Sequence, residues 1–65
     1  MTNLVNKKMT QAIHKNLIKA GYTLSCGNEN VLEYAFCHAG VTIKMLYIDL
    51  NEKNKIINVR EWKAS

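Results

Sequence analysis

The chain holds two cysteines and two histidines, the residue types best suited to binding a metal or to nucleophilic catalysis. By residue type alone, zinc could be ligated by Cys26, Cys37, His14 and His38. However, the sequence contains neither a C-x₂-C nor an H-x₃-H pair, the spacings typical of zinc ligands. Cys37 and His38 are adjacent, and adjacent residues of a strand point to opposite faces, so they would not meet as nucleophile and base. We therefore expect no metal site, no cofactor and no catalytic residues, and a protein that is not an enzyme.

A disulfide between the two cysteines is disfavoured by their spacing. If the first hairpin pairs Cys26 with Val31, Cys37 lies six residues further along the partner strand. That is roughly 20 Å at ~3.3 Å per residue, whereas a disulfide needs Cα atoms within about 7 Å. We expect both thiols to be free and to pack as small buried hydrophobic side chains on the face of Leu24.

The elements that must position these residues follow from the hydrophobic periodicity. Apolar residues recur at helical spacing in the first 20 residues, and Gly21 stands where a left-handed residue commonly ends a helix. After Gly21 the period changes to two, and clusters of Gly and Asn mark turns. We predict a helix over 3–20 and strands over 22–26, 31–38, 41–50 and 55–62. The fold class is then α+β, with an N-terminal α-helix packed on a four-stranded antiparallel β-meander.

One long helix is the alternative for residues 31–50, because apolar residues such as Leu32 and Leu46 fit a helical period as well. Gly40 and the β-branched run at 41–43 favour strands instead. The turn-rich sequence on both sides of this segment also favours the sheet.

Length and composition limit the class of protein. Sixty-five residues make a single domain, 1–65, and a composition that is 48% hydrophobic and 22% charged argues against disorder. So small a domain buries only about 60% of its unfolded surface and usually gains stability from a disulfide, a metal or a second chain. No stretch of about 20 residues lacks charge and no secretory signal is recognisable, so we expect a cytoplasmic protein without a membrane partner. The net charge of +4 suits an acidic partner, protein or nucleic acid.

Tight hairpins would set the register of the sheet and gather apolar side chains on both of its faces. They pair Phe36 with Ile43 around one turn and Leu50 with Lys55 around the next. One face then holds a predicted partner-binding set, rich in the aromatic, Met and Arg side chains that are typical of interface hot spots. This set is Tyr34, Phe36, Ile43, Met45, Tyr47, Arg60 and Trp62.

Both faces of the predicted sheet are apolar, yet a single helix is available to cover them. One apolar face should therefore be left over, and such a patch usually marks an interaction site. A bulge near Met45 and Leu46 is the alternative, because it would swap the faces midway along the strand and reduce the excess. A secondary basic strip is predicted on the helix, with a solvated basic flank as its alternative. It consists of Lys8, Lys15 and Lys19.

The function we predict is non-enzymatic binding of another protein through the aromatic face. Size and basic charge suit a small phage or mobile-element inhibitor, of the anti-CRISPR or anti-restriction type, that docks on a host defence complex and blocks it sterically. A homodimer through the same face is one alternative. A small basic nucleic-acid-binding protein is another, with bases stacked on the sheet and phosphates near Arg60 and the helix lysines.

A resemblance to a known family lies in one short segment of the chain. It reads Ile13-His14-Lys15-Asn16-Leu17-Ile18-Lys19-Ala20-Gly21-Tyr22. This segment resembles the first helix and strand of HicA-type toxins, which are small basic ribonucleases. The family's Gly-Ser-His segment is missing, and Cys37-His38-Ala39 is the nearest substitute for it. The resemblance implies a ribonuclease toxin as a further alternative function.

Overall fold

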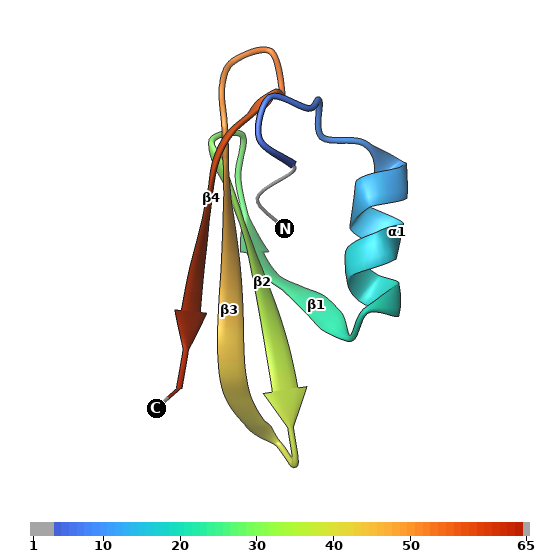
Figure 1. Cartoon of the computed structure of the whole chain (residues 1–65), viewed down its shortest axis with the longest axis vertical. Helices are drawn as coiled ribbons and strands as arrows, with labels where there is room; N and C mark the ends of the chain where they lie inside the picture. The colour runs from blue at the N-terminus through green and yellow to red at the C-terminus, as the bar shows by residue number, and fades with distance from the viewer. Residues whose placement is uncertain (1–3, 65) are drawn as a thin grey trace.

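The computed structural model describes residues 4–64 and shows a helix followed by four strands. The elements are α1 (Gln11–Lys19), β1 (Tyr22–Gly27), β2 (Val31–His38), β3 (Val41–Leu50) and β4 (Ile56–Lys63). The strands form one antiparallel sheet in the order β1-β2-β3-β4, and α1 packs against one side of it (Figure 1). The predicted α+β fold with a four-stranded meander is therefore confirmed, and each strand begins and ends within one residue of its predicted bounds.

The helix begins later than predicted, at Gln11 rather than at residue 3, which itself lies outside the described residues. Thr10 is the N-cap, with extended backbone angles, and its hydroxyl accepts a hydrogen bond from the backbone N–H of Ile13 at 3.3 Å. Capping of this kind satisfies a backbone donor that has no partner within the helix. The helix ends as predicted before Gly21, whose φ is +106°.

Residues 4–9, which we call the N-terminal strap, pair with the start of β4 instead of forming helix. Asn6 N–H donates to the carbonyl of Ile56 at 2.8 Å, and Ile56 N–H donates back to the carbonyl of Lys7 at 2.8 Å. Lys8 forms an isolated antiparallel bridge with Lys55. These backbone groups are therefore satisfied by a segment that is remote in sequence, which local periodicity does not reveal.

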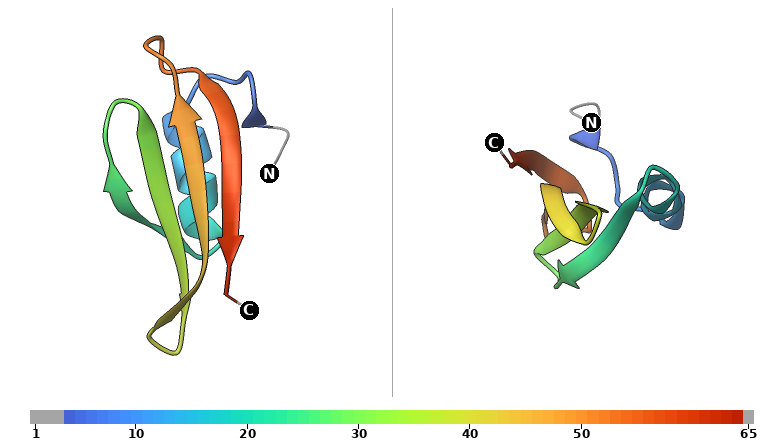
Figure 2. Two further views of the ribbon diagram at one scale, coloured as in Figure 1. Left: turned by 90° about the vertical axis from the view of Figure 1, so that its left-hand side faces the viewer. Right: turned by 90° about the horizontal axis from the view of Figure 1, so that it is seen from below.

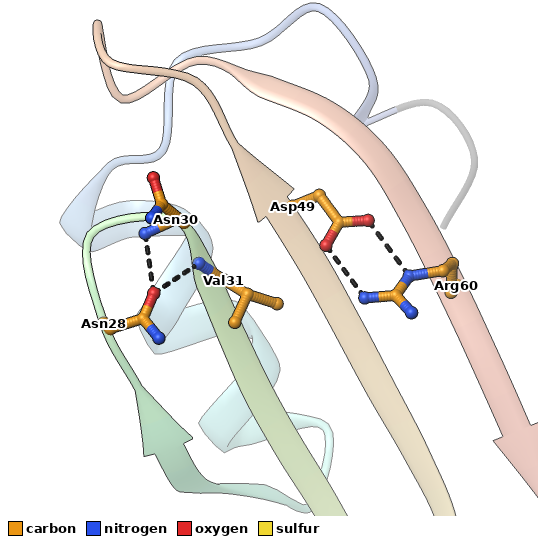
Figure 3. Close-up of polar contacts among 5 residues, drawn as sticks. All are labelled: Asn28, Asn30, Val31, Asp49 and Arg60. Atoms are coloured by element: carbon orange, nitrogen blue, oxygen red, sulfur yellow. Dashed lines mark hydrogen bonds and ion pairs between the residues drawn. The ribbon is translucent and has the colours of Figure 1, made fainter.

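The turns follow the chemistry of their residues. Asn28 closes the β1–β2 connection, because its side-chain oxygen accepts hydrogen bonds from the backbone N–H groups of Asn30 and Val31 at 2.7 and 2.9 Å (Figure 3). Ala39 and Gly40 both have positive φ, 52° and 79°, as a two-residue hairpin loop of the favoured kind requires. Local turn signals thus place the strands correctly.

The register of β2 against β3 differs from the predicted one by a single residue. Phe36 pairs with Lys44 rather than with Ile43, because Ile43 is the extra residue of a β-bulge next to the hairpin. Since side chains alternate along a strand, a one-residue slip moves every side chain of β3 to the other face relative to β2. The alternative of a bulge near Met45 and Leu46 is therefore correct in kind, but the bulge lies nearer the hairpin, at Ile43.

The register of β3 against β4 differs from the predicted one by two residues. Tyr47 pairs with Arg60, where Asn58 was predicted, and a further irregularity lies beside Leu50. A shift of two residues keeps each side chain on its own face. Side chains of β3 and β4 that are predicted to share a face therefore do share one. Side chains of β2 and β3 that are predicted to share a face lie on opposite faces instead.

The core lies between the sheet and α1. Its buried side chains are Leu17, Tyr22, Tyr34, Leu46, Ile48, Leu50 and Ile56. The strap and the helix add partly buried side chains from Leu4, Met9 and Ile13, so the strap packs on this core although it is not helical. No element formed by residues 4–64 covers the opposite side of the sheet (Figure 2, left).

Candidate functional site

The uncovered side of the sheet, which we call the outer face, is built by side chains that alternate with the core residues of β2, β3 and β4. Across these strands Glu33, Tyr47 and Arg60 share one row, because Glu33 pairs with Tyr47 and Tyr47 with Arg60. Between the bulge at Ile43 and the irregularity beside Leu50, the outer face of these three strands comprises Val31, Glu33, Ala35, Met45, Tyr47, Asp49, Asn58, Arg60 and Trp62.

The predicted partner-binding set is split between the two sides of the sheet. Four residues of the set share the outer face, as the sequence predicts: Met45, Tyr47, Arg60 and Trp62. Tyr34 and Phe36 do not join them, which corrects the predicted common face, because the bulge at Ile43 turns them to the side of the helix. Tyr34 is 1% exposed within the core, and Phe36 packs edge-on against Tyr22 with ring centroids 5.6 Å apart.

Arg60 is held in place at the centre of the β4 side of the outer face. It forms a bidentate pair with Asp49, in which Nε lies 3.0 Å from Oδ2 and Nη2 lies 2.9 Å from Oδ1 (Figure 3). Its guanidinium carbon also lies 5.2 Å from the centroid of the Tyr47 ring. The hydrogen bonds that Arg60 donates to Asp49, together with the negative charge of that carboxylate, raise the pKa of Arg60 above its usual value. An exposed ion pair adds little to the stability of the fold, so the main effect of Asp49 is to hold the side chain of Arg60 in one orientation.

Trp62 is the most exposed aromatic side chain that the outer face presents. It is 48% exposed, and across β3 it is aligned with the small residue Ala35, since Met45 pairs with both of them. Ala35 is 8% exposed, and its small side chain leaves the surface of the outer face lower there than at the larger neighbouring side chains. A half-exposed tryptophan beside a methionine, a tyrosine and an ordered arginine is the composition typical of an interface.

Sequence reasoning missed the two carboxylates of this face. Asp49 holds Arg60, whereas Glu33 makes no ion pair among the residues that the structure describes. The placement of Glu33 on the face of Tyr47 depends on the inverted register of β2 against β3. Asp49 shares that face with Tyr47 because the two lie two residues apart on β3, and the two-residue shift of β4 brings Arg60 beside it. Neither register is marked by a local signal in the sequence.

The predicted basic strip is not a continuous flank of the helix. Lys15 and Lys19 are exposed on α1, but Lys8 precedes the helix and lies in the strap beside Lys55. The sheet separates α1 from the outer face, so these lysines add no positive charge to it. Lys44 points to the side of the core, with its Nζ 4.6 Å from the centroid of the Phe36 ring.

Both cysteines are exposed, which corrects the prediction that they are buried. A bulge between Leu24 and Cys26 places Cys26 opposite Glu33 and away from the core. Cys37 lies near the β2–β3 turn, with its sulfur 3.4 Å from the hydroxyl of Thr42. Among residues 4–64, no three His, Cys, Asp or Glu side chains gather in a way that could hold a metal ion.

An open cleft of about 400 Å³ lies where the start of α1 meets β1 and β2. In it, Nδ1 of His14 lies 2.8 Å from the hydroxyl of Tyr34, and burial raises the pKa of that tyrosine. Tyr34 therefore stays neutral at neutral pH and each of the two groups satisfies the other. This pair joins the helix to the sheet.

Comparisons with known proteins give no assignment: no family model, no curated protein and no solved structure matches this chain. The resemblance of residues 13–22 to HicA-type toxins accordingly gains no support from them. No helix within the described part of the chain is long and apolar enough to cross a membrane.

Proposed function

We propose that this chain is a non-enzymatic protein-binding module and that the outer face of the sheet is its docking surface. The observation that supports the proposal is the exposure of Trp62 beside Met45, Tyr47 and an ordered Arg60, on a side of the sheet that no element of the described chain covers. Aromatic, Met and Arg side chains are enriched at protein interfaces, and a few of them usually dominate the binding energy. Ordering Arg60 before binding also lowers the entropy that association must overcome.

The charges of the outer face favour a protein over a nucleic acid as its partner. Arg60 is the cation of this face, and it is already engaged by Asp49, with Glu33 in its own row. A phosphate backbone approaching the face would meet two carboxylates, which oppose the contacts that dominate nucleic-acid binding. Tyr34 and Phe36, which would have supplied stacking surfaces for bases, belong to the core.

The cellular role that we propose is that of a small phage or mobile-element inhibitor of the anti-CRISPR or anti-restriction type. It would act by steric docking on a host defence complex, in the cytoplasm. Small size and the net charge of +4 support this class, and the outer face supplies the surface that such docking requires.

Partner capture with a matched pair of variants tests the proposal. Proteins that bind the tagged chain are identified, and the purified partner is then titrated with wild type, Trp62→Ala and Ile18→Ala. Ile18 lies on α1 and is 44% exposed, close to the 48% of Trp62, so it controls for the loss of an exposed apolar side chain. Loss of a hot spot worth about 2 kcal/mol should weaken binding by roughly 30-fold for Trp62→Ala. We expect Ile18→Ala to stay within about twofold of wild type.

Equal affinities for wild type and Trp62→Ala would refute the outer face as the docking surface. An electrophoretic shift of single- or double-stranded oligonucleotides at moderate salt, abolished by Lys15→Ala with Lys19→Ala, would instead favour the nucleic-acid alternative. Both titrated variants should keep the thermal unfolding midpoint of wild type within a few degrees, since both side chains are half-exposed.

A further inference from the structure

We propose that a second copy of this chain occupies the outer face, in a two-fold arrangement whose axis runs parallel to the strands. The inference rests on the proposed function, because it names one partner of the same face. It is carried by the way charge and side-chain size are distributed over β2, β3 and β4.

The outer face is acidic on β2 and basic on β4. Glu33 and Arg60 occupy the same row, one on each side of Tyr47. Neighbouring strands lie about 4.8 Å apart, so the backbones of Glu33 and Arg60 are about 10 Å apart within one copy. Arg60 bonds to Asp49 instead, and the carboxylate of Glu33 has no ion-pair partner within the described residues.

A two-fold axis parallel to β3 complements this distribution. It places β2 of one copy against β4 of the other, so that Glu33 faces Arg60 of the second copy at two symmetric positions. Arg60 would then lie between Asp49 of its own chain and Glu33 of the other. Charge-assisted hydrogen bonds between guanidinium and carboxylate are among the stronger polar contacts, and two carboxylates can share one guanidinium fork.

Side-chain size follows the same symmetry. In the adjoining row Trp62 of β4 faces Ala35 of the second copy, so a large exposed ring meets a low point of the opposing sheet. The residues of β3 meet their own copies, Met45 on Met45, Tyr47 on Tyr47 and Asp49 on Asp49. The bidentate pair with Arg60 of the same chain offsets the negative charge of each Asp49 at this contact. Sheets that pack face to face in this way keep their strands within about 30° of each other.

The other two-fold arrangement is disfavoured by charge. An axis in the plane of the sheet but perpendicular to the strands would place β2 against β2 and β4 against β4. Glu33 would then face Glu33, and Arg60 would face Arg60, which juxtaposes like charges across the interface. The charges therefore select one of the two symmetric packings.

The size of the face predicts a reversible dimer. With the axis along β3, only β2, β3 and β4 of the two copies overlap, because the strand order leaves β1 without a facing strand. A three-stranded face about eight residues long measures roughly 14 Å by 26 Å, or about 370 Å² per copy. The total of about 750 Å² is typical of a weak, transient contact. We expect a dissociation constant in the upper part of the micromolar range, so that a tighter partner competes with the second copy for the outer face.

Sedimentation equilibrium from about 1 µM to about 1 mM tests the dimer with charge-reversal variants. Wild type should pass from monomer to dimer over this range, and Glu33→Lys and Arg60→Glu should each weaken self-association at least tenfold. An equimolar mixture of these two variants should recover the dimer, because both symmetric contacts then join opposite charges. This recovery also shows that the separate variants are folded.

Matched controls lie on β4, the strand of Arg60, with their side chains on the opposite side of the sheet. Glu61→Lys and Lys63→Glu make the same charge changes on β4, where Glu61 pairs with Leu46 and Lys63 with Lys44 on the side of the core. Both should dimerise like wild type.

A chain that stays monomeric at about 1 mM would overturn the inference, and so would a dimer that resists both reversals or is disrupted equally by Glu61→Lys. The proposed function is judged separately, by titration of a purified partner with Trp62→Ala. A monomer whose partner binding depends on Trp62 would overturn this inference alone.

Discussion

Truncating Leu46 to alanine should remove much of the stability of the domain, whereas the same truncation of its neighbour Met45 should remove little. Leu46 is 0% exposed and packs in the core with Leu17 and Ile48, while Met45 points to the outer face. Removing a buried leucine side chain and leaving a cavity costs about 2–5 kcal/mol. A domain of this length has roughly 3–10 kcal/mol in total. For the half-buried Met45 we expect about 1 kcal/mol or less.

Urea unfolding followed by circular dichroism measures this difference. The protein should be kept at about 1 µM, so that self-association through the outer face does not stabilise either variant. With a slope near 1 kcal/mol per molar urea, Leu46→Ala should lower the midpoint by about 2 M or more, or unfold the chain without denaturant. A cost for Met45→Ala equal to or larger than that for Leu46→Ala would refute the register around Ile43 and make the outer face the core.

Further predictions concern the helix–sheet contact and the turns. Burial raises the pKa of Tyr34, so the stability that its neutral hydroxyl contributes is complete below about pH 10 and is lost as pH rises through the raised pKa. Urea titrations between pH 8 and 11 should show this loss of stability in wild type but not in Tyr34→Phe. An equal loss in both proteins would contradict the assignment of the pH dependence to Tyr34. Gly21→Ala should destabilise the protein far more than Gly40→Ala, although both glycines have positive φ. An added Cβ at Gly21 would lie 2.6 Å from Phe36 Cε2, whereas one at Gly40 meets nothing within 4 Å. Equal thermal unfolding midpoints of the two variants would contradict this prediction. Thr10→Ala should cost about 1 kcal/mol in urea through loss of the N-cap, and no change would argue that the strap alone sets the start of α1.

Sequence signals predicted the strands because their boundaries are local. The Asn28 turn, the Ala39–Gly40 hairpin and the stop at Gly21 each depend on residues within a few positions of one another. The start of the helix was predicted wrongly for the opposite reason. The strap satisfies its backbone through Ile56, which is remote in sequence.

Only part of the candidate site was predicted correctly. Which part depends on whether the register error between two strands is one residue or two, because successive side chains of a strand alternate between the two faces. Met45, Tyr47, Arg60 and Trp62 stay together because a two-residue shift between β3 and β4 preserves the face. Tyr34 was assigned to the wrong side because one bulged residue inverts β2 against β3, and no local signal distinguishes a bulge at Ile43 from a regular hairpin. The same inversion hid Glu33, and the two-residue shift of β4 hid the contact of Asp49 with Arg60.

Trp62 offers the most direct test that the outer face is a docking surface, because it is the chain's single tryptophan and lies on that face. Its acrylamide quenching and emission maximum can be followed from about 1 µM to about 1 mM protein, and again with a purified partner, beside the mass of the complex. We predict that quenching falls and the emission moves to shorter wavelength in step with complex formation. A complex that forms while the quenching and emission of Trp62 stay unchanged would contradict the account.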